Sequence, residues 1–214
     1  TALRLSLVCS VGAVVLSALL GTPLAWLLAR VSFPGRNVVR ALTVMPMVLP
    51  PVVGGVALLL AFGRQGMVGQ WLQQGLGVSL PFTTLGAIVA EAFVAMPFFV
   101  ITVEAGLRSM GRRYEDAAAT LGAGRWTTFR RVTLPLMMPS LGAGAALAWA
   151  RALGEFGATI TFAGNLPGAT QTMPLAVYLA LQTNTDAAIA LSLVMLVISL
   201  VVLVALRARW FPVR

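Results

Sequence analysis

Five long apolar stretches, separated by short polar segments, dominate the hydrophobic pattern of this 214-residue chain. A helix needs about 20 mostly apolar residues to cross a hydrocarbon core of roughly 30 Å. The stretches meet that length at residues 5–29, 41–62, 85–107, 137–160 and 187–206. The pattern therefore predicts an all-α integral membrane protein with five transmembrane helices. We expect the first stretch to be a true span, because it exceeds the core of a signal peptide and no cleavage site is obvious.

The polar segments predict loops and two shorter helices. Residues 64–83 are rich in glutamine and glycine around Trp71, which favours a loop with a short interfacial helix. Residues 161–186 are also polar, but residues 174–182 within them are apolar at helical spacing and too short to span. We expect that segment to lie at the outer surface. No repeat or linker divides the chain, so residues 1–214 are predicted to form a single transmembrane domain.

The second apolar stretch contains its own interruption. Three prolines and two glycines fall within 11 residues, at Pro46, Pro50, Pro51, Gly54 and Gly55. Such residues kink or break a helix, and in a membrane the freed carbonyls must be satisfied by protein or by a water-filled cavity. Two interpretations stay open: a helix that lines or gates a pore, with Pro50 and Pro51 at the gate, or a packing kink.

Composition excludes most catalytic chemistry. Apolar residues make up 59% of the chain and charged residues 10%, too few charges for the surface of a soluble domain. All 15 basic residues are arginine, histidine is absent, and Cys9 is the only cysteine. The chain therefore lacks a histidine-based nucleophile, a Schiff-base lysine and a phosphate-binding lysine loop. We predict a non-catalytic protein without a metal or cofactor of its own, which receives any energy from a partner.

The arginines predict the orientation in the membrane. Twelve of them fall in residues 30–40, residues 108–131 and the tail, which lie on one side of a five-span protein. Only Arg4 and Arg64 fall in the segments on the opposite side. Because positive residues concentrate on the cytoplasmic side, the N-terminus is expected outside and the C-terminus in the cytoplasm. The tail arginines are Arg207, Arg209 and Arg214. The net charge of +9 is thus a topological signal, and nothing indicates nucleic-acid binding.

The inner loop between the third and fourth expected spans, at about 108–134, contains the sharpest motif. A short helix over residues 114–123 is predicted, because acidic residues suit its first turn, alanines favour helix and Gly122 can end it in a left-handed turn. Small side chains allow close approach by a partner. The residues of this motif are Tyr114, Glu115, Asp116, Ala117, Ala118, Leu121, Gly122, Val132, Leu134 and Pro135.

This motif resembles the hallmark of membrane subunits of bacterial ATP-binding cassette importers. The hallmark reads Glu-Ala-Ala, three residues, Gly, nine residues, Ile, one residue, Leu-Pro. This chain keeps the spacing and differs only by Asp116 for Glu and Val132 for Ile. The resemblance implies the type I importer permease fold and a cytoplasmic coupling helix that docks on an ATPase subunit. It also implies two ATPase subunits that hold ATP and Mg, a second copy of this chain, surrounding lipid and an extracytoplasmic binding protein.

The fourth stretch contains a charged pair inside the membrane. Arg151 and Glu155 are four residues apart and can pair on one helical face. A buried arginine in a membrane should face protein or water. The pair either borders an anion's route or acts as a structural clamp near the cytoplasmic gate, and we favour the clamp. Thr159 and Thr161 suit the path of a hydrated oxyanion and equally suit close helix packing.

The run from Arg151 to Phe162, with the segments 165–168 and 172–174, is similar to molybdate importer permeases. The resemblance extends from about Leu16 onward. It implies the permease subunit of an importer of molybdate or its analogue tungstate, working by alternating access in a cell membrane. A sulfate or thiosulfate permease is the alternative within the same class. An ion-coupled secondary transporter is the alternative from another class.

Overall fold

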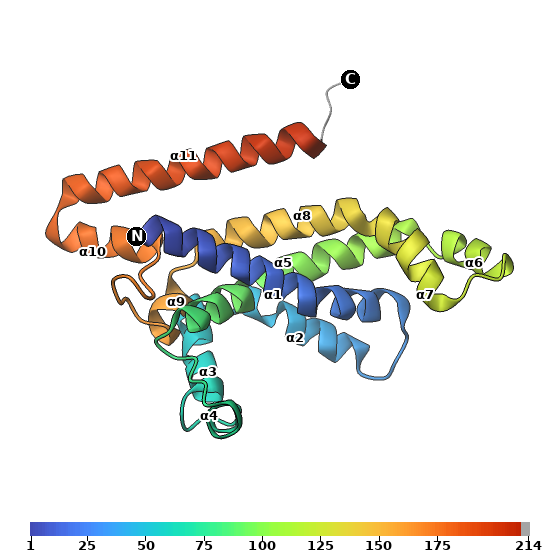
Figure 1. The fold of residues 1–214 in the computed structure, drawn as a ribbon, viewed down its shortest axis with the longest axis horizontal. Helices are drawn as coiled ribbons and strands as arrows, with labels where there is room; N and C mark the ends of the chain where they lie inside the picture. The colour runs from blue at the N-terminus through green and yellow to red at the C-terminus, as the bar shows by residue number, and fades with distance from the viewer. Residues whose placement is uncertain (211–214) are drawn as a thin grey trace.

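The computed structural model describes residues 1–210, and regular structure in this part of the chain is helical throughout. Three long helices, α1 (Ala2–Arg30), α5 (Thr84–Met110) and α8 (Leu134–Leu153), pack side by side as the central bundle (Figure 1). Helices α1 and α5 run in the same direction, and α8 runs in the opposite direction. All five expected regions are helical, but their boundaries differ in two places.

Small residues hold the bundle together. The core of the three helices includes Ala13, Ala25, Ala92, Ala95, Ala148 and Ala152 around the larger Phe99. A Cβ added to Gly21 would lie 2.9 Å from the Phe99 ring, and one added to Gly106 would lie 2.0 Å from the Ser140 hydroxyl. Helices in lipid associate by close van der Waals packing rather than by a hydrophobic driving force. The glycines and alanines therefore set how near the helix axes can come.

The second expected span is two helices rather than one. Helix α2 (Arg36–Val48) and helix α3 (Pro51–Phe62) are separated at Leu49 and Pro50, which are extended with ψ of 134° and 132°. Each of these residues precedes a proline, whose ring disfavours helical backbone at the position before it. The stretch at residues 41–62 is therefore two helices, and the predicted interruption is confirmed. Pro46 lies inside α2 and does not end it.

The fourth expected span is shifted along the chain. Helix α7 (Arg125–Thr128), the π-helical turn η1 (Phe129–Thr133) and α8 form a continuous apolar helix that ends at Leu153. The predicted extension to residue 160 is wrong, because the chain breaks at Gly154 and starts a separate short helix, α9 (Gly157–Phe162). The Glu155 carboxylate accepts a hydrogen bond from the Ala158 amide and so stabilises this new start.

The remaining helices lie around the bundle. Helix α4 (Gly69–Leu76) and helix α10 (Met173–Thr183) confirm the two expected short helices. Helix α11 (Thr185–Trp210) contacts mainly α10 and runs apart from the bundle (Figure 1). Within residues 1–210, four helical segments are long and apolar enough to cross a membrane, at Ala2–Arg30, Thr84–Met110, Arg125–Leu153 and Thr185–Val202. Arg214 and the side chains of Arg207 and Arg209 lie outside the described part.

Candidate functional site

Helix α6 (Arg113–Thr120) projects from one end of the bundle, where α1 and α5 end and α7 begins (Figure 1). Glu115 and Asp116 lie in its first turn as predicted. Gly122 follows with φ of +81°, the left-handed conformation that its sequence position indicates. Leu121 is 88% exposed, and Tyr114 and Trp126 are also exposed. The loop therefore presents apolar side chains that the described part of the chain leaves uncovered.

Polar contacts fix this exposed helix to the bundle. Glu115 Oε1 lies 3.1 Å from Arg30 Nη2 at the end of α1, and it accepts a hydrogen bond of 3.0 Å from the Thr133 hydroxyl in η1. Arg30 Nη2 also donates to the Gly111 carbonyl over 2.7 Å, and the Arg112 guanidinium donates to the Arg30 carbonyl. Movement of α6 is thereby connected to α1, to the end of α5 and to the start of α8.

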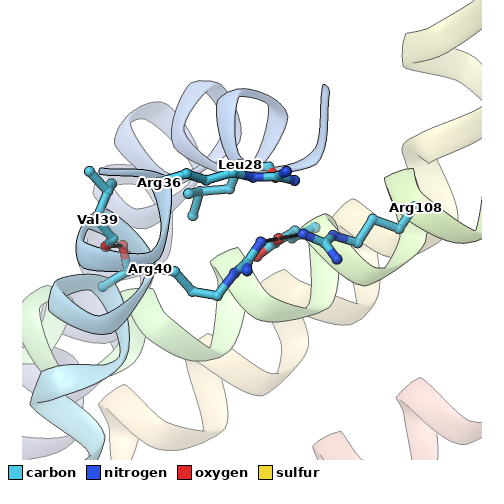
Figure 2. A network of polar contacts seen from close by, with 7 residues as sticks. Leu28, Arg36, Val39, Arg40 and Arg108 are labelled. Carbon is cyan, nitrogen blue, oxygen red and sulfur yellow. Dashed lines mark hydrogen bonds and ion pairs between the residues drawn. The ribbon is translucent and has the colours of Figure 1, made fainter. Parts of the chain in front are cut away.

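A second polar network joins α2 to the same end of the bundle (Figure 2). Glu104 of α5 is 2.6 Å from Arg40 Nη2 of α2 and 2.9 Å from Arg108 Nη2 on its own helix. The Arg36 guanidinium donates to the Leu28 carbonyl of α1. Helix α2 makes these contacts through Arg36 and Arg40, which the sequence analysis used only as topology markers. Glu104 had no predicted role, because hydropathy does not show which arginines will face it.

The predicted pair in the fourth stretch is formed. Arg151 Nη1 lies 2.6 Å from Glu155 Oε2, and the other carboxylate oxygen accepts the Ala158 amide hydrogen at 2.9 Å. Glu155 is 1% exposed, and these two partners satisfy both of its carboxylate oxygens within the fold. The pair lies at the end of α8 farthest from α6 (Figure 1). The pair is thus distant from α6, and its expected role as a clamp near the cytoplasmic gate stays a prediction.

The other predicted path residues gather where α3 contacts α9. A Cβ added to Gly157 would lie 2.7 Å from the Pro51 ring, and one added to Gly55 would lie 2.7 Å from Thr161. Thr161 donates to the Gly157 carbonyl over 2.8 Å. Thr159 is buried and its hydroxyl has no hydrogen-bond partner. Pro51, the ion pair and the threonines thus belong to one region, which is separate from α6, and Pro50 lies at the adjoining break.

Glu91 of α5 is a polar residue near this region that the sequence analysis did not single out. It is 1% exposed, and its Oε2 has no hydrogen-bond partner. Its neighbours along α5, Ala90 and Val94, pack with Ala158 and Phe162 of α9. A carboxyl group inside a predicted span was a signal that could have marked it.

Known proteins are similar in sequence to this chain along most of its length. Residues 21–212 match the family described as binding-protein-dependent transport system inner membrane component. The molybdenum transport system permease protein ModB of Mycobacterium tuberculosis is 49% identical over 98% of this chain and 79% of its own length. The ModB protein of Escherichia coli is 42% identical over 98% of this chain and 91% of its own length.

A sulfate relative and a solved structure are also similar. The sulfate transport system permease protein CysT of Escherichia coli is 40% identical over 94% of this chain and 73% of its own length. The crystal structure of a bacterial ABC transporter that imports the acidic polysaccharide alginate has a TM-score of 0.77 at 18% identity. The match covers 99% of this chain and 78% of the alginate transporter chain. The structural match establishes the fold, an all-helical importer permease.

Proposed function

This chain belongs to the family of binding-protein-dependent transport system inner membrane components, and we propose that it is the permease subunit of an ATP-driven molybdate importer. The evidence for molybdate as the substrate is the sequence identity of 42–49% to molybdenum permeases along nearly the whole chain. The sulfate permease is slightly less similar, at 40% over 94% of the chain. The protein is a non-catalytic inner-membrane subunit, and its family works with an ATPase and a binding protein.

We propose five membrane crossings, with the N-terminus outside and the C-terminus in the cytoplasm. Helices α1 and α5 run in the same direction, so the intervening segment must return the chain to the other side (Figure 1). The pair α2 and α3 makes this return in two short pieces of 13 and 12 residues. Arg30, Arg40, Arg108 and Arg112 all lie at the α6 end of the bundle, which supports a cytoplasmic location for that end.

Helix α6 is proposed to couple the membrane helices to the ATPase. Its exposed Tyr114, small alanines and Leu121 provide a surface for docking. When ATP closes the ATPase subunits, α6 follows their motion, and Glu115 transmits the displacement to Arg30 and Thr133. Arg30 belongs to α1, and Thr133 belongs to η1, which continues into α8. One displacement of α6 therefore tilts both α1 and α8, which pack against α5. Alternation between two such states moves substrate without an open pore.

The contact between α3 and α9 is proposed to border the path. The break at Pro50 and Pro51 allows α3 to move separately from α2, and the glycines at the contact permit sliding. Both oxygens of Glu155 are occupied, so the pair with Arg151 is a clamp that holds the end of α8 to α9. Thr159 and Thr161 lie beside it as candidate path residues. A neutralised arginine is a poor ligand for an oxyanion, which supports the clamp.

The assembly is proposed to contain two copies of this chain, two ATPase subunits that hold ATP and Mg, and an extracytoplasmic oxyanion-binding protein. Uptake of radiolabelled molybdate by proteoliposomes that contain this whole complex tests the function. We expect uptake that requires ATP on the ATPase side and resists an equal concentration of sulfate. Strong competition by sulfate would favour a sulfate permease. Uptake by this chain without its ATPase would favour a secondary transporter.

A further inference from the structure

A cleft of about 440 Å³ opens between the end of α1, α6 and α7. This volume falls within the range of about 300–1,000 Å³ typical of small-molecule sites. Three guanidinium groups line it, from Arg30, Arg112 and Arg125, together with the carboxylates of Glu115 and Asp116. The lining therefore has one net positive charge. A cleft with this charge attracts an anion.

The charges of the cleft are only partly satisfied within the chain. Glu115 is occupied by Arg30 and Thr133. The side chain of Arg30 is 7% exposed, yet its Nε is buried without a hydrogen-bond partner. Among the ion pairs of the described residues, none includes Arg112, Arg125 or Asp116. The cleft thus combines two guanidinium groups outside these ion pairs, of which Arg112 also donates to the Arg30 carbonyl, with the carboxylate of Asp116. This combination matches an anionic group bearing its own hydroxyl donors.

An apolar track leads from the cleft along α1. Trp26 lines the cleft one turn before Arg30, where the apolar part of α1 ends. Leu19, Val15 and Val8 lie on the same face at helical spacing, and all are exposed, Leu19 by 67%. Tryptophan at the end of a span is typical of the headgroup level of a membrane. Charge at the headgroup level and an exposed apolar face below it together fit a lipid molecule.

We propose that this cleft binds the headgroup of an anionic phospholipid of the cytoplasmic leaflet, with its acyl chains along the exposed face of α1. The phosphodiester oxygens accept hydrogen bonds from the Arg112 and Arg125 guanidinium groups. A glycerol headgroup donates to Asp116, which a choline headgroup is unable to do. Basic clefts between membrane helices bind anionic headgroups in this way. The lipid would bridge α1 and α7 directly beside the tether of α6.

The test uses the complete complex in nanodiscs of phosphatidylcholine containing a minor fraction of phosphatidylglycerol. The lipids that stay bound after detergent extraction are counted by mass spectrometry. We expect wild type to enrich phosphatidylglycerol and Arg125→Gln to lose about fivefold of that enrichment, since one arginine near a membrane surface contributes about 1 kcal/mol. Arg130→Gln is the matched control, because Arg130 is exposed in the same loop and does not line the cleft. It should retain the wild-type enrichment.

Three outcomes would overturn the proposal. Equal retention of both lipids by wild type would show that the cleft does not select an anionic headgroup. Loss of enrichment in 10 mM inorganic phosphate, but not in chloride of the same ionic strength, would make a free oxyanion the ligand. Detachment of the ATPase in Arg125→Gln with unchanged lipid would assign the cleft to a protein partner. No substrate enters these measurements, so they stand apart from the test of molybdate transport.

Discussion

Glu115 of the exposed helix α6 and Arg30 at the end of α1 form an ion pair of 3.1 Å. The pair is the direct link between the proposed docking surface and the membrane helices. Arg30 is almost wholly buried, so removal of its partner leaves a charge that water reaches poorly. The relationship gives the coupling mechanism a specific residue pair to test.

Replacement of Glu115 by Gln should reduce substrate-stimulated ATP hydrolysis by at least tenfold while the complex still assembles. The amide keeps its size but loses the charge that holds Arg30. The exchange variant with Arg30→Glu and Glu115→Arg should recover part of the stimulation, because the pair is restored in reverse. ATPase assays of the reconstituted complex measure both. Undiminished stimulation in Glu115→Gln would show that the force passes through other contacts.

Gly122→Val should abolish stimulation without preventing membrane insertion. No atom lies within 4 Å of the position where a Cβ would be, so the cost comes from φ of +81°, which disfavours any side chain by about 1–2 kcal/mol. Gly124 is the matched control: it also has open space, but its φ is −68°. Stimulated ATPase activity should therefore survive Gly124→Val. Equal losses in both variants would contradict a role for the left-handed turn.

Glu104→Gln should raise ATP hydrolysis in the absence of substrate several-fold. Glu104 holds Arg40, and loss of its charge frees α2 from α5 at the end of the bundle near α6 (Figure 2). Arg108→Gln removes the other guanidinium and leaves the contact between α2 and α5 in place. Basal activity should change little in that control. A large rise in the control alone would mean that Arg108, and not α2, restrains the resting state.

The clamp interpretation of Arg151 and Glu155 predicts that the charges are dispensable when removed together. Arg151→Gln alone leaves Glu155 buried and unpaired, so thermal stability and complex yield should fall. The double variant Arg151→Met with Glu155→Gln keeps an acceptor for the Ala158 amide and should recover both. The KM for molybdate uptake should stay within about twofold of wild type. A large rise in KM with normal stability would instead place Arg151 on the anion's route.

Gly157→Ala should destabilise the contact between α3 and α9 by about 1–3 kcal/mol, because the added Cβ would lie 2.7 Å from Pro51 Cβ and 3.1 Å from the Val52 amide nitrogen. Gly154→Ala is the matched control, since the nearest atom to its added Cβ would be the Ala150 carbonyl oxygen at an ordinary 3.9 Å. Thermal unfolding of the purified complex compares the two. A control that loses as much stability as Gly157→Ala would contradict the packing argument.

Several features were predictable because they depend on local composition. The apolar runs at residues 5–29, 85–107 and 187–206 each correspond to one long helix. Residues before Pro50 and Pro51 are restricted by the proline that follows, so the break was visible as well. The spacing of Arg151 and Glu155 implied their pairing, and the pair forms although Glu155 lies beyond the end of α8 at Leu153. Each of these signals acts over a single helical turn or along one apolar run.

Other features depended on packing between distant segments. Hydropathy placed the fourth span at residues 137–160, yet the helix starts at residue 125 and ends at Leu153. Residues 157–162 form α9, which packs against α3 and is largely buried, and apolarity alone does not separate a spanning helix from a buried short one. From the sequence, Glu104 was assigned no partner, and Glu115 was assigned only a favourable interaction with the helix dipole. Their partners, Arg40 and Arg30, come from other helices.

The sequence by itself determined that this is a lysine-free, helical membrane protein with an arginine-rich side and a short helix, proposed for docking, on that side. Apolar length, charge placement and motif spacing are one-dimensional properties, so no fold was needed to read them. Only the tertiary structure decided where the second span divides, which acids hold the arginines and how α6 is tethered to α1 and η1. Those outcomes depend on which helix ends meet in space, because a charge buried near a membrane is stable only beside the partner that the packing brings to it.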